Sequence, residues 1–215
     1  MQTTAGTPLR DSLIYSGLST INQRRLVMER RDFVKRALSS SSLLLAFQLG
    51  GATVLLSPRE ARAKQVPFNH LAGQDVQLLQ QLLDLIVPGA VQAGTVHFID
   101  QQLGVEPDDC LLILKFFELP PPYSNFYTAG FDAIRRHAQE QFGRDISALT
   151  AAQKQQLLQY IATPEQVDAA GFPIFLFYLC LRSDAVDMVY GTPEGFEKLN
   201  IPYMAHIMPP ENRRE

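Results

Sequence analysis

Apolar residues recur at intervals of three and four along most of the chain, which is the pattern of helices that bury one face. The clearest stripe lies within 75–87 and consists of Val76, Leu79, Leu82, Leu83 and Ile86. Pro88 and Gly89 then predict the end of that helix. The same pattern predicts a second helix over 90–104 and a third over 107–119.

Capping residues predict further helices in the second half of the chain. Ser124 is a suitable N-cap for a helix over 126–142. Thr150 and Gln153 have the spacing of a capping box, and the segment 163–166 repeats this spacing with proline at the first helical position. We therefore predict an all-α fold: a compact domain of about six or seven helices, without an internal repeat.

The run 172–191 begins with ten consecutive apolar residues, 172–181. A helix that is apolar on every side is normally buried all round, which predicts the central core helix. A buried strand would give the same short run. In a further interpretation one face stays exposed and is covered by another chain, and the domain has aromatic material for such an interface in Phe116, Phe117, Tyr123, Phe126 and Tyr127.

Charge divides the chain into two parts. Residues 1–63 carry a net charge of +5 (nine Lys or Arg against four Asp or Glu), whereas residues 64–215 carry −8 (ten against eighteen). An acidic body disfavours nucleic acid as a partner, because Lys and Arg must neutralise the phosphates. We interpret 1–63 as a basic leader and 64–215 as the working helical domain.

The leader contains an apolar stretch of 14 residues, 43–56. A membrane-spanning helix needs about 20 apolar residues, whereas the apolar part of a secretory signal has roughly 7–15. Ala61 and Ala63 follow as the small residues of an A-x-A cleavage site. We therefore expect a cleavable signal segment, after which Lys64 is the first mature residue.

A pair of arginines ahead of the apolar stretch makes the signal more specific. Arg30, Arg31, Phe33 and Lys35 stand at the spacing of a twin-arginine signal, the address read by the Tat translocase. A glutamate and a valine replace two residues usual in that motif. Because Met28 directly precedes it, the core signal is 28–63, and the chain starts either at Met1 or at Met28. The alternative is a basic helix on the protein surface.

The chain has two cysteines, Cys110 and Cys180, and no Cys-x-x-Cys motif. This excludes c-type haem attachment and cysteine-ligated iron–sulfur clusters in this chain. Both cysteines lie in apolar runs. They form either one disulfide in an oxidising compartment or two buried free thiols.

Candidate chemistry is sparse. His97 and Asp100 share a helical face at i, i+3, which is compatible with metal ligation and also with an ordinary surface hydrogen bond. The carboxylate pair Asp184 and Asp187 fits a solvated helical face. Nucleophile, dinucleotide and P-loop motifs do not occur in the sequence. We therefore predict no catalytic, cofactor-binding or metal-binding residue in this chain.

Two segments, 88–104 and 184–210, carry a further pattern. Its positions are Pro88, Gly89, Ala90, Ala93, Gly94, Phe98, Ile99 and Asp100, followed by Asp187, Val189, Tyr190, Gly191, Gly195, Phe196, Leu199, Pro202, Tyr203 and His206. Together with the twin-arginine leader these segments resemble the family called gluconate 2-dehydrogenase subunit 3. Tails of that family often close with a tryptophan after the double proline, and this chain contains no tryptophan.

The resemblance implies a heteromeric sugar or gluconate-type dehydrogenase. Its large subunit is a flavoprotein that binds FAD, and a cytochrome c subunit with haem c passes electrons onward. The small subunit is non-catalytic: it escorts the flavoprotein through Tat export and stabilises it. The complex would lie in the periplasm, at the outer face of the inner membrane, and associate with the membrane through the partner subunits. The alternatives are an independent periplasmic helical enzyme and a ligand-binding module.

The tail of the chain is the predicted contact surface for a partner. Gly191 suits the left-handed position after a helix, and 192–195 then fits a turn. The apolar, proline-containing segment 201–210 should be extended, and it either packs on its own domain or docks on a partner. The expected contact residues are Tyr190, Gly191, Phe196, Pro202, Tyr203 and His206.

Overall fold

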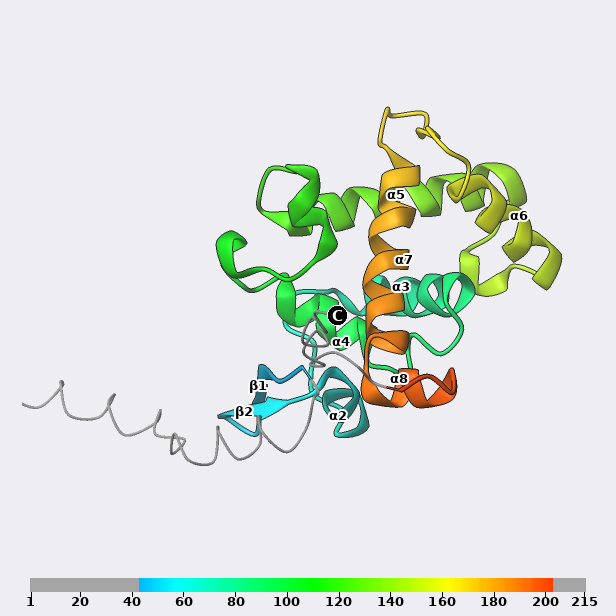
Figure 1. The fold of residues 1–215 in the computed structure, drawn as a ribbon. Coiled ribbons are helices and arrows are strands. Elements are labelled where there is room, and N and C mark those ends of the chain that lie inside the picture. The colour runs from blue at the N-terminus through cyan, green and yellow to red at the C-terminus, as the bar shows by residue number, and fades with distance from the viewer. Residues whose placement is uncertain (1–42, 203–215) are drawn as a thin grey trace, which may run out of the picture. The chain divides into compact units, whose positions relative to one another are not determined.

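Helices make up most of the structure, a computed structural model that describes residues 43–202 (Figure 1). The α-helices in this part of the chain are α2 Pro58–Ala63, α3 Gly73–Ile86, α4 Thr95–Gln102, α5 Tyr123–Phe142, α6 Ala151–Ile161, α7 Ile174–Tyr190 and α8 Pro193–Lys198. Short 3-10 helices are η1 Pro107–Asp109, η2 Ile113–Phe117 and η3 Ile146–Ala148, and the strands are β1 Leu45–Leu49 and β2 Ala52–Leu56. The predicted all-α class is confirmed. None of the helices within 43–202 has the length and apolarity needed to cross a bilayer.

Helix α7 is the centre of the core. It contacts α3, α4, α5, α6 and η2 along its length, and α8 folds back against its C-terminal end (Figure 1). Its buried side chains are Ile174, Phe177, Cys180, Leu181, Asp184, Ala185 and Val189. The run 172–181 therefore contributes the predicted core helix, and the strand alternative is wrong.

A glycine lets α5 approach α7 closely. A Cβ atom at Gly130 would lie 2.5 Å from the Phe177 ring. That ring also meets Tyr127 and Phe131 edge-on, at centroid distances of 6.0 and 5.8 Å. Edge-to-face pairs of this kind add to the stabilisation that burial provides.

Two predicted helices do not form. The segment 107–119 contains only η1 and η2, because the chain is extended at Cys110 and Leu112. The segment 163–166 is a turn, and Glu165 has a φ of 63°, outside the helical range. The helix predicted over 90–104 is shorter, because Gly94 has a φ of 87° and α4 begins after it.

The capping predictions have mixed outcomes. Thr150 forms the predicted capping box at α6, with its side chain accepting from the Gln153 N–H and the Gln153 side chain accepting in return. Ser124 is not an N-cap, because α5 already begins at Tyr123 after Pro122.

A β-hairpin precedes the helices, in the stretch interpreted as the apolar part of the signal. β1 and β2 pair antiparallel from Leu45 opposite Leu56 to Leu49 opposite Ala52. Gly50 and Gly51 turn the chain with φ values of 59° and 77°, the positive values that a two-residue type I′ hairpin turn requires at both positions. The hairpin belongs to the same compact unit as the helices.

Candidate functional site

Asp100 occupies a polar centre on α4 and is only 4% exposed. Its carboxylate accepts hydrogen bonds from the backbone N–H groups of Asn69, His70 and Leu71, each at 2.9 Å. Backbone donors of this kind satisfy the oxygen atoms of a buried carboxyl group. Asp100 therefore fixes the loop before α3 onto α4.

His97 contacts the same loop, which connects α2 and α3. Its Nε2 atom lies 3.2 Å from the Val66 carbonyl oxygen, and its ring lies 4.5 Å from the Phe68 ring. Burial lowers the pKa of His97, against the opposing effect of the Val66 carbonyl. Within residues 43–202 no group of three or more His, Cys, Asp or Glu side chains could hold a metal ion. His97 and Asp100 instead both bond to backbone groups of the loop between α2 and α3.

Asp184 is a second buried carboxyl group, on α7, with 2% of its surface exposed. It accepts from the Ile113 N–H at 3.1 Å and from the Tyr127 hydroxyl at 3.4 Å. Burial is the main cause that raises the pKa of Asp184 to about 7, and the nearby Asp187 acts in the same direction. Asp184 thus joins α7, α5 and η2, and the predicted solvated position is wrong for it.

The two cysteines lie buried near this carboxyl group as free thiols. The Cys110 thiol donates to the Gln102 carbonyl at 3.7 Å. Burial raises the pKa of Cys110, and it raises the pKa of Cys180 to about 12. Of the two alternatives for the cysteines, the structure contains the buried thiols.

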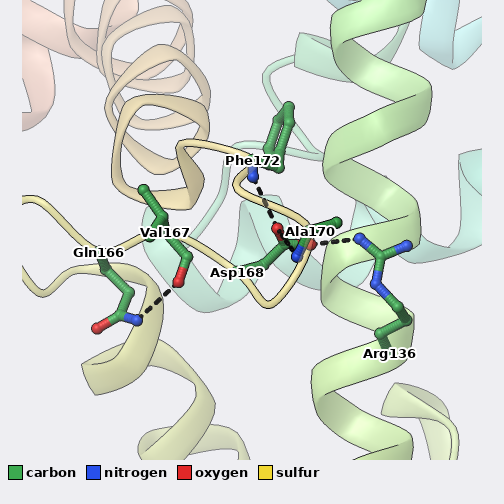
Figure 2. Close-up of polar contacts among 6 residues, drawn as sticks. All are labelled: Arg136, Gln166, Val167, Asp168, Ala170 and Phe172. Atoms are coloured by element: carbon green, nitrogen blue, oxygen red, sulfur yellow. Dashed lines mark hydrogen bonds and ion pairs between the residues drawn. The ribbon is translucent and has the colours of Figure 1, made fainter.

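Asp168 closes the turn that leads into α7 (Figure 2). It accepts from the backbone N–H groups of Ala170 at 2.9 Å and Phe172 at 2.7 Å, and it forms an ion pair with Arg136 of α5. Burial acts to raise the pKa of Asp168, but Arg136 and the two amides outweigh it, so the pKa lies below its ordinary value. This carboxylate ties the turn to α5.

Exposed apolar side chains gather in a C-terminal corner, defined here as residues 190–202. Tyr190, Leu199 and Ile201 are 36%, 49% and 49% exposed. The corner is built by α8, whose first turn is capped by Thr192 and whose Gly195 lies so close to α7 that a Cβ atom would meet the Val189 carbonyl oxygen at 2.4 Å.

The corner contains four of the six predicted contact residues, namely Tyr190, Gly191, Phe196 and Pro202, while Tyr203 and His206 lie outside the described residues. Gly191 has a φ of −76°, so the predicted left-handed conformation is wrong. It is suited to glycine for another reason: a Cβ atom there would lie 2.6 Å from the Asp187 carbonyl oxygen. The predicted turn over 192–195 is the start of α8.

A second exposed apolar group lies on the segment 106–122. Phe116 is 75% exposed, Leu111 50% and Phe117 43%. Phe116 and Phe117 belong to the aromatic set that the sequence offers for an interface, whereas Tyr123 and Tyr127 of the same set are buried. The chain therefore presents two apolar groups on the described surface.

The comparison with known families decides the identity of this domain. Residues 73–208 match the family model described as Gluconate 2-dehydrogenase subunit 3. The chain belongs to this family. The gluconate 2-dehydrogenase subunit 3 family takes its name from one subunit of an enzyme, which implies a multi-subunit complex. No match was found among curated proteins or solved structures.

The match includes Asp100, Asp168, Asp184 and the C-terminal corner, and it begins after the hairpin, α2 and the loop held by Asp100. In this member of the gluconate 2-dehydrogenase subunit 3 family, the matched helices therefore pack against about 30 preceding residues. The twin-arginine motif of Arg30, Arg31, Phe33 and Lys35 lies outside the described residues and stays a prediction.

Proposed function

We propose that this chain is the non-catalytic small subunit of a heteromeric, FAD-dependent sugar or gluconate-type dehydrogenase. In this proposal it stabilises the flavoprotein subunit and escorts it through Tat export. The family match carries the proposal, because it makes the chain a subunit of an enzyme named for its reaction. The buried carboxylates support it, because each accepts hydrogen bonds from the fold itself.

The chemistry is assigned to the partners. The flavoprotein subunit would bind FAD and oxidise the substrate, and a cytochrome c subunit would receive the electrons on haem c. The complex would act in the periplasm, at the outer face of the inner membrane, and these partners would hold it there. A twin-arginine signal on the small subunit suits a large subunit that folds around its cofactor before export.

The C-terminal corner is the proposed contact surface for the flavoprotein. Exposed tyrosine and branched apolar side chains are suited to a protein interface, because burying them removes apolar area from water while the tyrosine hydroxyl keeps a polar partner. Tyr190, Leu199 and Ile201 provide this surface within the described residues. Tyr203 and His206 would extend it along the tail.

The proposal is tested by recovering the complex through this chain. A tagged chain is expressed in its native host, and the periplasmic fraction is purified. We expect a large subunit with a flavin absorbance spectrum and a haem-containing subunit to co-purify. A purified chain that oxidises a sugar alone, with an artificial electron acceptor, would contradict the accessory role.

A substitution in the corner should break the complex and leave the domain folded. Ile201→Asp places a charge where an apolar side chain would be buried against the partner, so we expect at least about a tenfold loss of co-purified flavoprotein, since such a loss corresponds to about 1.4 kcal/mol. Val167→Asp is the matched control, because Val167 is 52% exposed and lies outside the corner. Equal recovery with both variants would place the interface elsewhere.

A further inference from the structure

Residues 45–63 are built into the core of the domain although the sequence pattern places them in a removable leader. The hairpin buries Leu45, Phe47 and Leu56, which are 7%, 6% and 3% exposed. On β1 the alternation is strict, since Ala46 and Gln48 point outward between the buried residues. One face of the hairpin is thus a packing face, and β1 contacts α4.

Helix α2 is locked to α4 by a backbone contact. A Cβ atom at Gly94 would lie 2.2 Å from both the carbonyl carbon and the carbonyl oxygen of Pro58, and 2.6 Å from the Arg59 nitrogen. Only a residue without a side chain allows this approach. Gly94 lies inside the family match, and Pro58 lies before it. The glycine at position 94 is therefore explained by its contact with the segment that precedes the match.

Part of the predicted cleavage site is folded into this contact. Ala63 and Lys64 are exposed at the C-terminal end of α2, where the Lys64 N–H donates to the Glu60 carbonyl at 2.9 Å. Ala61 is fully buried in α2, its N–H donates to the Ser57 carbonyl at 2.9 Å, and its carbonyl accepts from the Val66 N–H at 3.0 Å. A reciprocal capping box between Ser57 and Glu60 secures the start of the helix. Peptidases cut chain that is exposed and free of such hydrogen bonds, so α2 would have to unwind before the Ala63–Lys64 bond could be cut.

We propose that residues 45–63 are a permanent part of the folded domain and that the Ala63–Lys64 bond is closed to cleavage once α2 has docked on α4. The removable part of the leader then ends before Leu45. Cleavage at Lys64 would take three large apolar side chains out of the core and leave the Gly94 backbone uncovered. The proposal takes 45–63 out of the cleavable signal, and its tests are separate from those of the escort role.

The first test is the N-terminus of the protein that cells accumulate. The untruncated gene is expressed in the native host, and the chain is recovered from the periplasmic and membrane fractions for intact-mass measurement and N-terminal sequencing. We expect the first residue to lie ahead of Leu45. A stable chain that begins at Lys64 would overturn the proposal, and it would leave the co-purification result untouched.

A pair of glycine variants tests the docking itself. Gly94→Ala introduces a clash with Pro58, whereas Gly89→Ala imposes the same backbone strain in open space, because Gly89 has a φ of 89° and nothing lies within 4 Å of its Cβ position. In limited trypsinolysis of the full chain, we expect cleavage after Arg62 to be at least about tenfold faster in Gly94→Ala than in Gly89→Ala, in proportion to the opened population. Equal rates would contradict docking.

A second pair keeps the test valid where Gly94→Ala fails to fold. Phe47→Ser removes a buried ring from β1, and Ala46→Ser changes its outward-facing neighbour. We expect Phe47→Ser to lower the Tm of the full chain by about 10 °C, which is the usual consequence of losing a buried aromatic side chain in a domain of this size. The Tm of Ala46→Ser should stay within about 2 °C of the wild type. If both variants melt like the wild type, the hairpin is no part of the core.

Discussion

Three buried carboxylates hold the irregular parts of the domain in place. Asp100 fixes the loop before α3, Asp168 closes the turn before α7, and Asp184 takes the N–H of Ile113 at the start of η2. In the sequence the three residues stand on separate segments, and the backbone groups that they bind lie 2 to 71 residues away. Sequence spacing could not reveal such roles, because it registers side chains on one element and not distant N–H groups.

The raised pKa of Asp184 predicts a specific pH dependence. The unfolded chain releases this proton near pH 4 and the folded chain near pH 7, so the free energy of unfolding falls as the pH rises between these values. Asp184→Asn removes the titration. We expect the wild type to lose up to about 3 kcal/mol more stability than Asp184→Asn between pH 5 and pH 8. Urea unfolding at the two pH values measures this difference, and equal losses would contradict the assignment.

The buried thiols should be unreactive in the folded chain. Reaction requires an exposed thiolate, while Cys110 and Cys180 are 3% and 0% exposed and burial raises the pKa of both. We expect no reaction with Ellman's reagent under native conditions and two thiols per chain in concentrated urea. One reactive thiol in the native chain would contradict the burial of the cysteines, and no reactive thiol in urea would contradict their being free.

At the scale of elements, regular helices could be predicted and the connections could not. The stripe within 75–87 and the apolar run 172–181 define α3 and α7, because a buried face or a buried helix dictates the pattern directly. The segment 107–119 is equally apolar, but Asp184 and the extended Cys110 hold it as two short 3-10 turns. The Gly50–Gly51 pair between two apolar runs is a hairpin signal, and a signal-peptide interpretation of the same residues hid it.

The sequence predicts both Thr150 and Ser124 as helix N-caps, and only Thr150 is one. Thr150 accepts the Gln153 N–H at the start of α6, whereas Ser124 lies in the first turn of α5 and caps nothing there. We therefore expect Thr150→Ala to lower the free energy of unfolding by about 1 kcal/mol and Ser124→Ala to change it by less than about 0.5 kcal/mol. Urea denaturation of both variants checks this, and the reverse order would contradict the boundaries of α5 and α6.

At the scale of the whole molecule, the family match and the exposed apolar C-terminal corner both fit a subunit that binds other protein chains. The all-α class and the family were predictable, the first from periodicity and the second from the paired segments 88–104 and 184–210. The place of residues 43–63 was not, because an apolar stretch before an A-x-A motif has the same composition whether it is removed or packed. Export and assembly remain the proposed functions that join the leader to the domain.

The export of the flavoprotein tests the central proposal most directly. Arg30→Lys with Arg31→Lys disables the twin-arginine motif and leaves the described domain unchanged, and Arg24→Lys with Arg25→Lys is the matched control outside the motif. The flavoprotein subunit is then followed by immunoblotting of cytoplasmic and periplasmic fractions. The escort proposal predicts that this chain and the flavoprotein both stay in the cytoplasm with the Arg30 and Arg31 variant only. A flavoprotein that still reaches the periplasm with that variant would contradict it.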